Sequence, residues 1–505
     1  MDYSLFIWST ATFIETRLKE EIDYSALEKT VGFSYRHIRE TFRECTGISL
    51  SQYILMRRIA NSAFEIIHTT NSLTQIASEY MFNSYDTFTR AFKRHTNIIP
   101  SDFRKRSCKV GRRRLLMGMF APAIIKDEDT SLLSTKISEV DNSMKNAKKT
   151  ENSCILYGVP KVAYSFEECT PFCASLKACL NYIGQNMDYA YIMAATGAAF
   201  RLRWNTRFWD GGNVDVMNIY EDRFEAFKRA FKAAGRSYRI LERNNADKND
   251  FIDFIKSEID EGRPVIALGI IGPPEACVVT GYKDSGETLL GWNCFQENQE
   301  FAKGIEIDES GYFISKSWWE NKYTLALMSV GEKQHELVSP KEIIDNAIDI
   351  MIKDKVIFRD VDGRESIEYA GGQRAYELWA SWVSDNNEFP KNAVLPILIE
   401  RIMCQSDAQV MVGEGRSYAA RFIEWVGKEN EEVLDKCNQT AKYFKMAAEC
   451  AFKMNEPKGG FIQDEQTTRK FAEPQVRKQI VPLIRKAKEY DAKAYELLKE
   501  IALKL

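Results

Sequence analysis

A short segment occurs twice near the N-terminus, and this repeat constrains the fold more than any other feature of the chain. Residues 27–33 (LEKTVGF) correspond to residues 76–82 (IASEYMF). After each copy, apolar residues recur one helical turn apart, as Ile38 with Phe42 and as Phe88 with Phe92. Each copy therefore predicts a helix, a tight turn and a second helix. An apolar stripe in residues 50–67 predicts a longer helix that joins the two units.

Residues 8–107 resemble the DNA-binding domain of the AraC/XylS family, in which two helix-turn-helix units joined by a long helix read adjacent major grooves. The likeness is most specific in the second unit, at Ile76-Ala77, Phe82, residues 88–94 and residues 100–104. Three residues depart from the family pattern: Glu28 replaces a usual Ala, Met81 a usual Gly in the turn, and Asn97 a usual Gly before the Pro. Met81 would cost about 1 kcal/mol if its φ is positive.

The resemblance implies two exposed recognition helices that contact base edges and phosphates. In the first unit we expect DNA contacts from Ser34, Tyr35, Arg36, His37 and Arg39. In the second we expect them from Ser84, Tyr85, Asp86, Thr87 and Arg90, with phosphate contacts from Lys93, Arg94, Arg104, Lys105 and Arg106. Without the repeat, the same side chains would be typical of a solvated bundle surface.

The charge distribution agrees with a polyanionic partner for the N-terminal region. Residues 1–114 hold 18 basic and 12 acidic residues, a net charge of +6, and the remainder holds 51 and 60, a net charge of -9. A basic N-terminal region followed by an acidic remainder, here called the body (residues 115–505), favours nucleic acid as the partner of the N-terminal region. The basic run in residues 105–118 either grips the DNA backbone or is a solvated hinge.

A helix with a cysteine in its first turn opens the next region. Residues 170–184 predict this helix, and Cys173 lies near its start. The helix dipole stabilises a thiolate at such a position, as in cysteine nucleophiles. Buried strands are predicted at residues 264–268, 277–282 and 289–293, the last two joined by a turn at 283–286.

This order resembles the papain-like domains of bacteriocin-processing peptidases and, more closely, the butirosin biosynthesis protein H family, which use a Cys-His-Asp or Cys-His-Asn arrangement. The resemblance assigns the histidine position to Ala276 or Cys277 and the acid or amide position to Asn293. The four histidines of the chain are elsewhere, at positions 37, 68, 95 and 335. Without an imidazole base, a thiol of ordinary pKa is only a few per cent ionised at neutral pH. We therefore expect a papain-like fold that has lost its catalytic activity, in which Cys173 and Asn293 are what remains of the catalytic arrangement.

The sequence thus predicts a multidomain chain: an all-α tandem helix-turn-helix domain, then an α+β papain-like domain with a largely helical C-terminal region. The expected boundaries are 1–108 for the DNA-binding domain, 109–153 for a basic joint and polar linker, 154–334 for the papain-like domain and 335–505 for the helical domain. Within the last, apolar recurrence predicts helices over residues 340–358, 371–384, 390–428, 429–454 and 474–503.

A papain-like domain without catalytic activity can still bind a small molecule in its pocket. Such a pocket in one chain with a DNA-binding domain is the domain organisation of a ligand-responsive regulator. We expect ligand contacts from the thiol site, from an aromatic segment and from two glycine-interrupted segments, namely Cys173, Cys277, Asn293, Trp204, Phe208, Trp209, Tyr376, Glu414 and Arg416. Each is equally typical of a core side chain or a helix cap. The acidic body suggests a cationic or amino-sugar-like effector.

We interpret the chain as a one-component transcriptional regulator whose partners are double-stranded DNA and a small molecule. No cofactor is predicted, and no zinc site is predicted because the eleven cysteines contain no C-x-x-C pair. No apolar run reaches the ~18–20 residues of a membrane span and no secretory signal is present, so we expect a cytoplasmic protein. Two alternatives stay open: a Cys173-dependent acyltransferase or amidase fused to a DNA-binding domain, and a body that only forms a homodimer.

Overall fold

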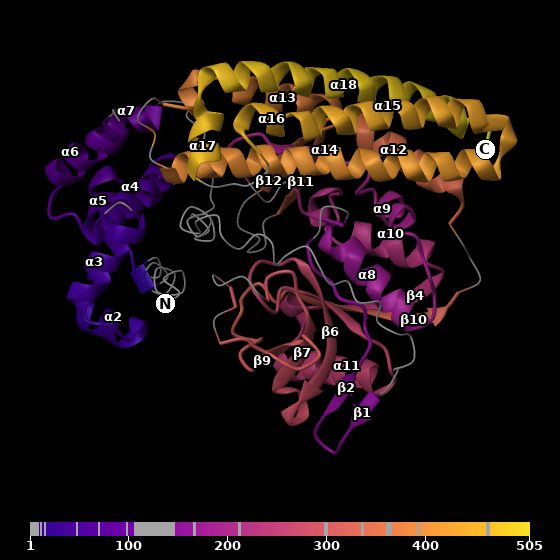
Figure 1. Cartoon of the computed structure of the whole chain (residues 1–505), viewed down its shortest axis with the longest axis horizontal. Helices are drawn as coiled ribbons and strands as arrows, with labels where there is room; N and C mark the ends of the chain where they lie inside the picture. The colour runs from indigo at the N-terminus through magenta and orange to yellow at the C-terminus, as the bar shows by residue number, and fades with distance from the viewer. Residues whose placement is uncertain are drawn as a thin grey trace.

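The computed structural model of the chain describes residues 10, 13–14, 17–46, 49–68, 71–96, 99–105, 147–164, 168–210, 214–296, 301–302, 304–334, 338–359, 366–390, 393, 395–460 and 465–505. Figure 1 shows a helical N-terminal domain at one end, a layer of long helices along the top, and a domain of strands and shorter helices below that layer. Asn97 and residues 109–146 of the joint and linker predicted over 109–153 lie outside the described residues.

The described part of the N-terminal domain is entirely helical. Its helices are α2 (Tyr24–Val31), α3 (Tyr35–Thr46), α4 (Leu50–His68), α5 (Leu73–Glu79), α6 (Tyr85–Thr96) and α7 (Pro100–Lys105). The pairs α2–α3 and α5–α6 are the two predicted helix-turn-helix units, and α4 joins them. The side chain of Asp23 caps α2 and that of Ser72 caps α5.

The long helix α4 contributes to two separate cores, one for each unit. Tyr53 and Ile54 pack in the first core, whereas Ile59, Ala63 and Ile66 pack in the second. All five side chains are at least 93% buried. The apolar stripe predicted for residues 50–67 is therefore confirmed, and it ties the two units to one rigid element.

Both tight turns between the paired helices contain a residue with positive φ. Gly32 has φ 78° in the first unit, and Met81 has φ 63° in the second. Glycine adopts this conformation without steric cost, whereas an L-residue with a Cβ is strained there. Met81 thus has the positive φ for which we predicted a strained backbone.

An antiparallel sheet forms the centre of the lower domain. Its strands follow the order β4-β10-β5-β6-β7-β9-β8, and β2 pairs with both β1 and β6. Their bounds are β1 Ala147–Lys149, β2 Cys154–Leu156, β4 Arg236–Glu242, β5 Val265–Leu268, β6 Ala276–Lys283, β7 Thr288–Trp292, β8 Glu306–Ile307, β9 Phe313–Ser315 and β10 Ala326–Lys333. The predicted hairpin is confirmed as β6 and β7, joined at Asp284–Gly286.

The linker predicted to end at residue 153 is shorter than expected. Lys148 and Lys149 pair with Ile155 and Cys154 in the β1–β2 hairpin, and β2 then continues along the edge of β6. Polar residues in β1 concealed this strand, because its three side chains are all exposed. The sheet domain therefore begins by residue 147.

Four helices accompany this sheet: α8 (Pro171–Tyr182), α9 (Tyr189–Ala195), α10 (Glu225–Ala233) and α11 (Lys248–Asp260). Helix α8 packs on β5 and β6 and also contacts α9. Ten of its twelve residues are buried, as expected for a central helix.

A second, three-stranded sheet links the two halves of the body. It runs in the order β11-β12-β3, with bounds Lys355–Arg359, Ser366–Gly371 and Arg203–Asn205. The helix predicted over 340–358 is wrong in its last part: α12 (Pro340–Ile352) ends early, and the chain turns into β11. Strand β3 comes from the predicted papain-like segment but pairs with β12 beyond residue 335.

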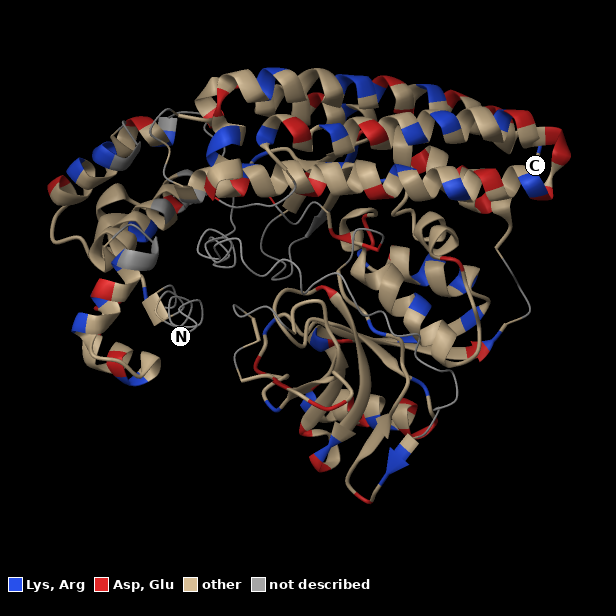
Figure 2. Ribbon diagram, in the orientation of Figure 1, with Lys and Arg blue, Asp and Glu red and all other residues tan. Residues whose placement is uncertain are grey.

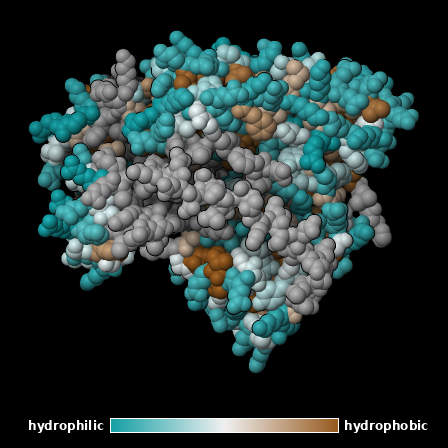
Figure 3. Space-filling model, in the orientation of Figure 1, coloured by the Kyte–Doolittle hydropathy of each residue, from teal (hydrophilic) through white to brown (hydrophobic). Residues whose placement is uncertain are grey.

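The remaining helices confirm the predicted helical C-terminal region. They are α13 (Gly372–Ser384), α14 (Leu395–Glu429), α15 (Leu434–Lys453), α16 (Asn455–Lys458), α17 (Glu465–Ala472) and α18 (Pro474–Ala502). Helices α14, α15 and α18 pack side by side. Their outer surface is mainly hydrophilic in the view of Figure 3. None of the helices described is long and apolar enough to span a membrane.

Candidate DNA-binding surface and thiol site

Both recognition helices begin at a serine whose hydroxyl accepts a backbone hydrogen bond. Ser34 Oγ accepts from the N–H of His37 at 3.4 Å, and Ser84 Oγ accepts from the N–H of Thr87 at 3.1 Å. The Thr87 hydroxyl lies 3.0 Å from Ser84 Oγ. An N-cap hydroxyl satisfies an N–H that the helix leaves unpaired. Ser34, Ser84 and Thr87 thus shape the helix starts as well as being predicted DNA contacts.

The predicted contacts in the first unit already engage neighbouring side chains. Arg36 Nε lies 3.0 Å from Glu40 Oε1, one helical turn away, with both side chains well exposed. The Arg39 guanidinium lies 5.7 Å from the centre of the Tyr35 ring. His37 is half-buried. This surface is exposed, but its arginines are partly neutralised or stacked.

The second recognition helix presents a more strongly basic surface. Arg90, Lys93 and Arg94 are all exposed on α6, and Figure 2 shows the basic positions on this helix. Arg90 Nε makes a 3.4 Å contact with the carbonyl of Asp86, one turn earlier. Asp86 is exposed and Tyr85 is half-buried. Exposed cations in this arrangement suit DNA phosphates and guanine edges.

Arg104 bonds to two protein carbonyls, and the phosphate contact predicted for it stays a prediction. Its Nε donates to the carbonyl of Ile66 at 2.8 Å, and its Nη2 donates to the carbonyl of Asn71 at 2.7 Å. These carbonyls lie at and just beyond the end of α4, where helix acceptors lack partners. Arg104 therefore fastens α7 to α4. The side chain of Lys105 and all of Arg106 lie outside the described residues.

Glu28 contributes to the recognition surface in a way that the sequence analysis missed. Its Oε1 accepts a 2.6 Å hydrogen bond from the N–H of Tyr35, the first residue of α3. The only sequence signal was that an acidic residue replaces the family's usual Ala. The carboxylate thus sits at the positive end of the first recognition helix.

Cys173 lies in the first turn of α8, as predicted, but it is completely buried. Its Sγ is 3.7 Å from the hydroxyl of Thr196, at the end of α9. Burial raises the pKa of the Cys173 thiol to about 12, and the Thr196 contact only partly opposes this. The expected thiolate stabilisation by the helix dipole is therefore outweighed by the loss of solvent.

Cys277 and Asn293 lie together on the hairpin, at the positions that the resemblance assigned. Cys277 Sγ donates to the carbonyl of Gly269 at 3.6 Å, and Asn293 Nδ2 donates to the same carbonyl at 2.9 Å. Both side chains are buried, and burial raises the pKa of Cys277 to about 12. The remaining histidine of the body, His335, lies outside the described residues.

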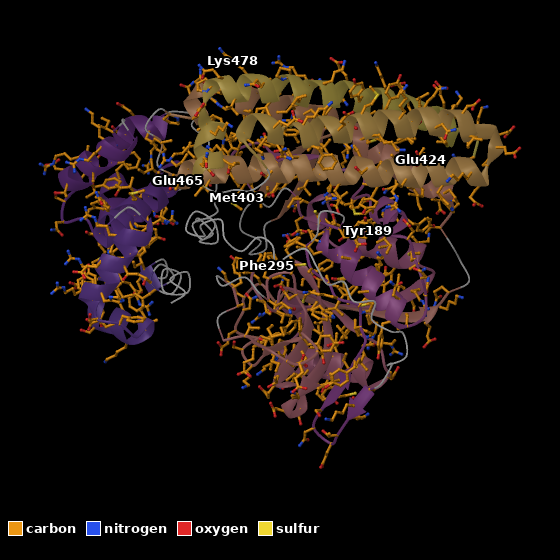
Figure 4. All side chains as sticks on the ribbon, in the orientation of Figure 1. Tyr189, Phe295, Met403, Glu424, Glu465 and Lys478 are labelled. Atoms are coloured by element: carbon orange, nitrogen blue, oxygen red, sulfur yellow. The ribbon has the colours of Figure 1, made fainter. Side chains whose placement is uncertain are left out.

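The start of α8 is held by a glutamate from the helical region. Glu414 Oε1 accepts from the N–H of Cys169 at 2.6 Å and from the hydroxyl of Tyr189 at 2.8 Å, and Oε2 accepts from the hydroxyl of Thr170 at 2.8 Å. Figure 4 shows Tyr189 beneath α14. Desolvation raises the pKa of Glu414 although these hydrogen bonds favour its ionised form. The carboxylate thus binds the two residues that immediately precede α8, Cys169 and Thr170.

Arg416 lies close to Glu414 in sequence, Tyr376 shares an acceptor with Arg416, and both add further hydrogen bonds. We call the set formed by Glu414, Arg416 and Tyr376 the clasp. Arg416 donates to both carboxylate oxygens of Asp491 and to the carbonyls of Ala199 and Arg201. Tyr376 donates to Asp491 Oδ2 at 2.8 Å. Both side chains are at least 98% buried. Arg416 thus joins the helical region to residues 199 and 201, whereas Tyr376 joins α13 to α18 within the helical region. The ligand role predicted for both stays a prediction.

The aromatic segment predicted to wall a ligand site packs as a core. The Trp204 ring centre lies 5.3 Å from that of Trp209 and 5.6 Å from that of Trp382. Rings this close contact one another directly and leave no space between them for a ligand. Phe208 is also buried. Trp209 Nε1 donates to the buried carboxylate of Glu388 at 3.0 Å.

Sequence reasoning also missed two thiols near the hairpin. Cys169 precedes α8 and Cys294 follows Asn293, and both are half-buried. Burial raises the pKa of each, in Cys169 to about 12. Within the part of the chain that the structure describes, no group of three or more His, Cys, Asp or Glu side chains is arranged to hold a metal ion.

Comparisons with known proteins bear on the N-terminal domain. The family model described as "Helix-turn-helix domain" matches residues 27–106. The chain is 33% identical over 104 residues to the uncharacterized HTH-type transcriptional regulator YbfP of Bacillus subtilis, covering 21% of this chain and 35% of that protein. It is 31% identical over 107 residues to the transcriptional regulator Rob of Salmonella typhimurium, covering 21% and 37%. The chain thus spans about a third of the length of these curated relatives.

A shorter relative is covered almost throughout. The probable transcription factor PqrA of Proteus vulgaris is 34% identical over 95 residues, which are 18% of this chain and 78% of that protein. A crystal structure of a transcriptional regulator with an AraC-type DNA-binding domain from Chromobacterium violaceum aligns with TM-score 0.19 and 24% identity, over 20% of this chain and 89% of that chain. Through its N-terminal domain, the chain belongs to the AraC-type helix-turn-helix family of transcriptional regulators.

Proposed function

We propose that the chain is a ligand-responsive one-component transcriptional regulator. Its two helix-turn-helix units would bind adjacent major grooves of double-stranded DNA, and its body would sense a small molecule. The observation that carries the proposal is the pair of exposed recognition helices on one rigid α4, with Arg90, Lys93 and Arg94 exposed on the second. DNA binding needs this combination of base-reading side chains and cations.

For the body, the proposal is recognition without catalysis. Cys173 is fully buried, and its pKa of about 12 leaves a negligible thiolate fraction at neutral pH. The residue at the hairpin position of the family's histidine is Cys277 or Ala276, neither of which is a base. Glu414 accepts hydrogen bonds from Cys169 and Thr170, which immediately precede α8. These features favour a retained papain-like fold that has lost its reaction.

We propose that the effector binds beside the start of α8, at a rim formed by the half-buried residues Cys169 and Cys294. All nine predicted ligand contacts are at least 94% buried, so a ligand reaching them would have to displace protein contacts. Cys169 and Cys294, in contrast, are half-buried. A small molecule at this rim would touch the start of α8 and thereby Glu414 of the clasp. The net charge of the body continues to favour a cationic effector.

The DNA-binding part is tested by selecting duplexes from a random library with the full chain. We expect a defined site of two adjacent half-sites, with an affinity that falls steeply with salt. Binding with no sequence preference would contradict the regulator assignment.

The sensing part is tested by thermal shift against a library of metabolites and antibiotics. A ligand that binds the folded state raises the melting temperature by mass action. If no compound shifts the melting temperature, the dimerisation alternative gains support, and sedimentation of the full chain then reports the oligomer. Turnover of an acyl thioester that is abolished in Cys173→Ala would instead establish the enzyme alternative.

A further inference from the structure

The first recognition helix carries its own anion at the end that would face DNA. Helix α3 begins at Tyr35, and the Tyr35 N–H donates to Glu28 Oε1 at 2.6 Å. Glu28 lies in the preceding helix α2 and is half-buried. Its carboxylate is therefore fixed at the helix start by a short charge-assisted hydrogen bond.

A helix start attracts anions because its first N–H groups are unpaired and the helix dipole is positive there. In a DNA complex, backbone N–H groups at such positions bind phosphates. The Glu28 carboxylate uses one of these donors and adds a negative charge beside the others. Both effects lower the attraction between this end of α3 and DNA.

The second unit lacks this device. In the repeat, Ala77 occupies the position that corresponds to Glu28, and it is 99% buried. Both recognition helices are capped by a neutral serine hydroxyl, Ser34 in α3 and Ser84 in α6, so the two starts differ in the additional carboxylate of Glu28. An anion can therefore approach the second recognition helix without meeting a carboxylate from the preceding helix.

The charges along the two helices differ in the same direction. Helix α3 has three basic and two acidic residues, and its Arg36 is paired with Glu40. Helix α6 has three basic residues and one acidic residue. That acidic residue, Asp86, lies in the first turn of α6 and is exposed, whereas Glu28 is half-buried and bonded to the first N–H of α3. The second helix is thus the more basic of the two, and the carboxylate near its start is the more fully solvated.

We propose that Glu28 is a specificity-determining residue that weakens the first unit's hold on DNA and makes the second unit the anchor. This inference rests on the proposed DNA-binding function. The second unit supplies most of the affinity, and the first unit discriminates among sequences from a weakly held position.

The test compares Glu28→Gln with the unaltered full chain on a duplex selected by the unaltered chain. The amide oxygen keeps an acceptor for the Tyr35 N–H, so the change removes the charge and preserves the cap. We expect binding to tighten about 2–5-fold at low salt, the range for a charge at a helix end. Glu20→Gln is the matched control, because Glu20 is an exposed acid of the same domain outside both recognition helices, and it should leave the affinity nearly unchanged.

A second readout separates this role from a structural one. Repeating the selection with Glu28→Gln should strengthen the base preference in one half-site, whereas Arg90→Ala should weaken it in the other. Unchanged or weaker binding by Glu28→Gln, with the melting temperature retained, overturns the proposal. So does an equal gain in Glu20→Gln. Loss of all specific binding in the unaltered chain would instead refute the proposed function itself.

Discussion

The backbone strain at Met81 allows a test in which glycine should be more stabilising than alanine. Met81 has φ 63°, a conformation that costs an L-residue about 1–2 kcal/mol. Glycine avoids this cost but loses about 0.5–1 kcal/mol more backbone entropy on folding. Met81→Gly and Met81→Ala both remove the side chain, which is 41% exposed. Comparing them isolates the backbone term, and the Gly variant should be more stable by about 1 kcal/mol.

The first unit offers the same comparison in reverse. Gly32 has φ 78°, and a Cβ built there would meet no atom within 4 Å. Gly32→Ala should therefore lose about 1 kcal/mol through backbone strain alone. At Gln75, an exposed position of helix α5, the order should be inverted, with Ala more stable than Gly by about 0.5–1 kcal/mol.

Hydrogen exchange of the full chain measures these differences locally. Amides of α5 and α6 report the opening of the second unit, and about 1 kcal/mol corresponds to an approximately fivefold change in protection. Met81→Gly should protect these amides more than Met81→Ala does. If Ala matches or exceeds Gly at position 81 while the order at Gln75 is normal, the strain assigned to this turn is refuted.

Three further predictions concern DNA contacts and buried groups. Arg90→Ala should weaken specific binding more than non-specific binding, whereas Lys93→Ala should weaken both and lower the salt slope by about 1; equal effects in titrations over a salt series would reject these roles. Burial lowers the pKa of Lys458 to about 8, so the folded state holds its proton less tightly than the unfolded state does. Its charge therefore destabilises the folded state below pH 8, and this effect disappears as the pH rises toward 10.5. Thermal melts should show that Lys458→Met raises the free energy of unfolding by about 1–3 kcal/mol at pH 7 and by much less at pH 10. Because its pKa is about 12, Cys173 should resist iodoacetamide at pH 8 until the chain is unfolded, as mass spectrometry would show; rapid labelling of the native chain would contradict its burial.

The sequence predicted best the features that depend on local pattern. The helices of the N-terminal domain, helix α8 and the β6–β7 hairpin follow from apolar periodicity and turn residues within short segments. Comparison with the family glycine showed that Met81 would be strained if its φ were positive, and φ is 63°. Each of these depends on neighbours within a few residues, which a single sequence displays directly.

The site was harder to predict because its partners are distant in the chain. Cys173 is buried, and the helix start beside it is held by Glu414, a residue of α14. The sequence did not predict the protein acceptors of Arg104, because they are 33 and 38 residues earlier in the chain. The tryptophans at 204 and 209 were correctly seen as a cluster. Their packing against Trp379 and Trp382 of helix α13 involves residues far along the chain, which the sequence does not bring together.

The crossing of α14 over the sheet domain limits how the chain can be divided into fragments. Gly415 has no Cβ, and one added there would lie 3.0 Å from the carbonyl oxygen of Ala199, so the two backbones approach closely. On either side, Glu414 and Arg416 supply partners to Thr170 and to the carbonyl of Arg201. A recombinant piece cut at the predicted boundary of residue 334 would expose these groups and the tryptophan face around β3. Expression trials that aim at a folded sensor should therefore keep residues 147–505 intact.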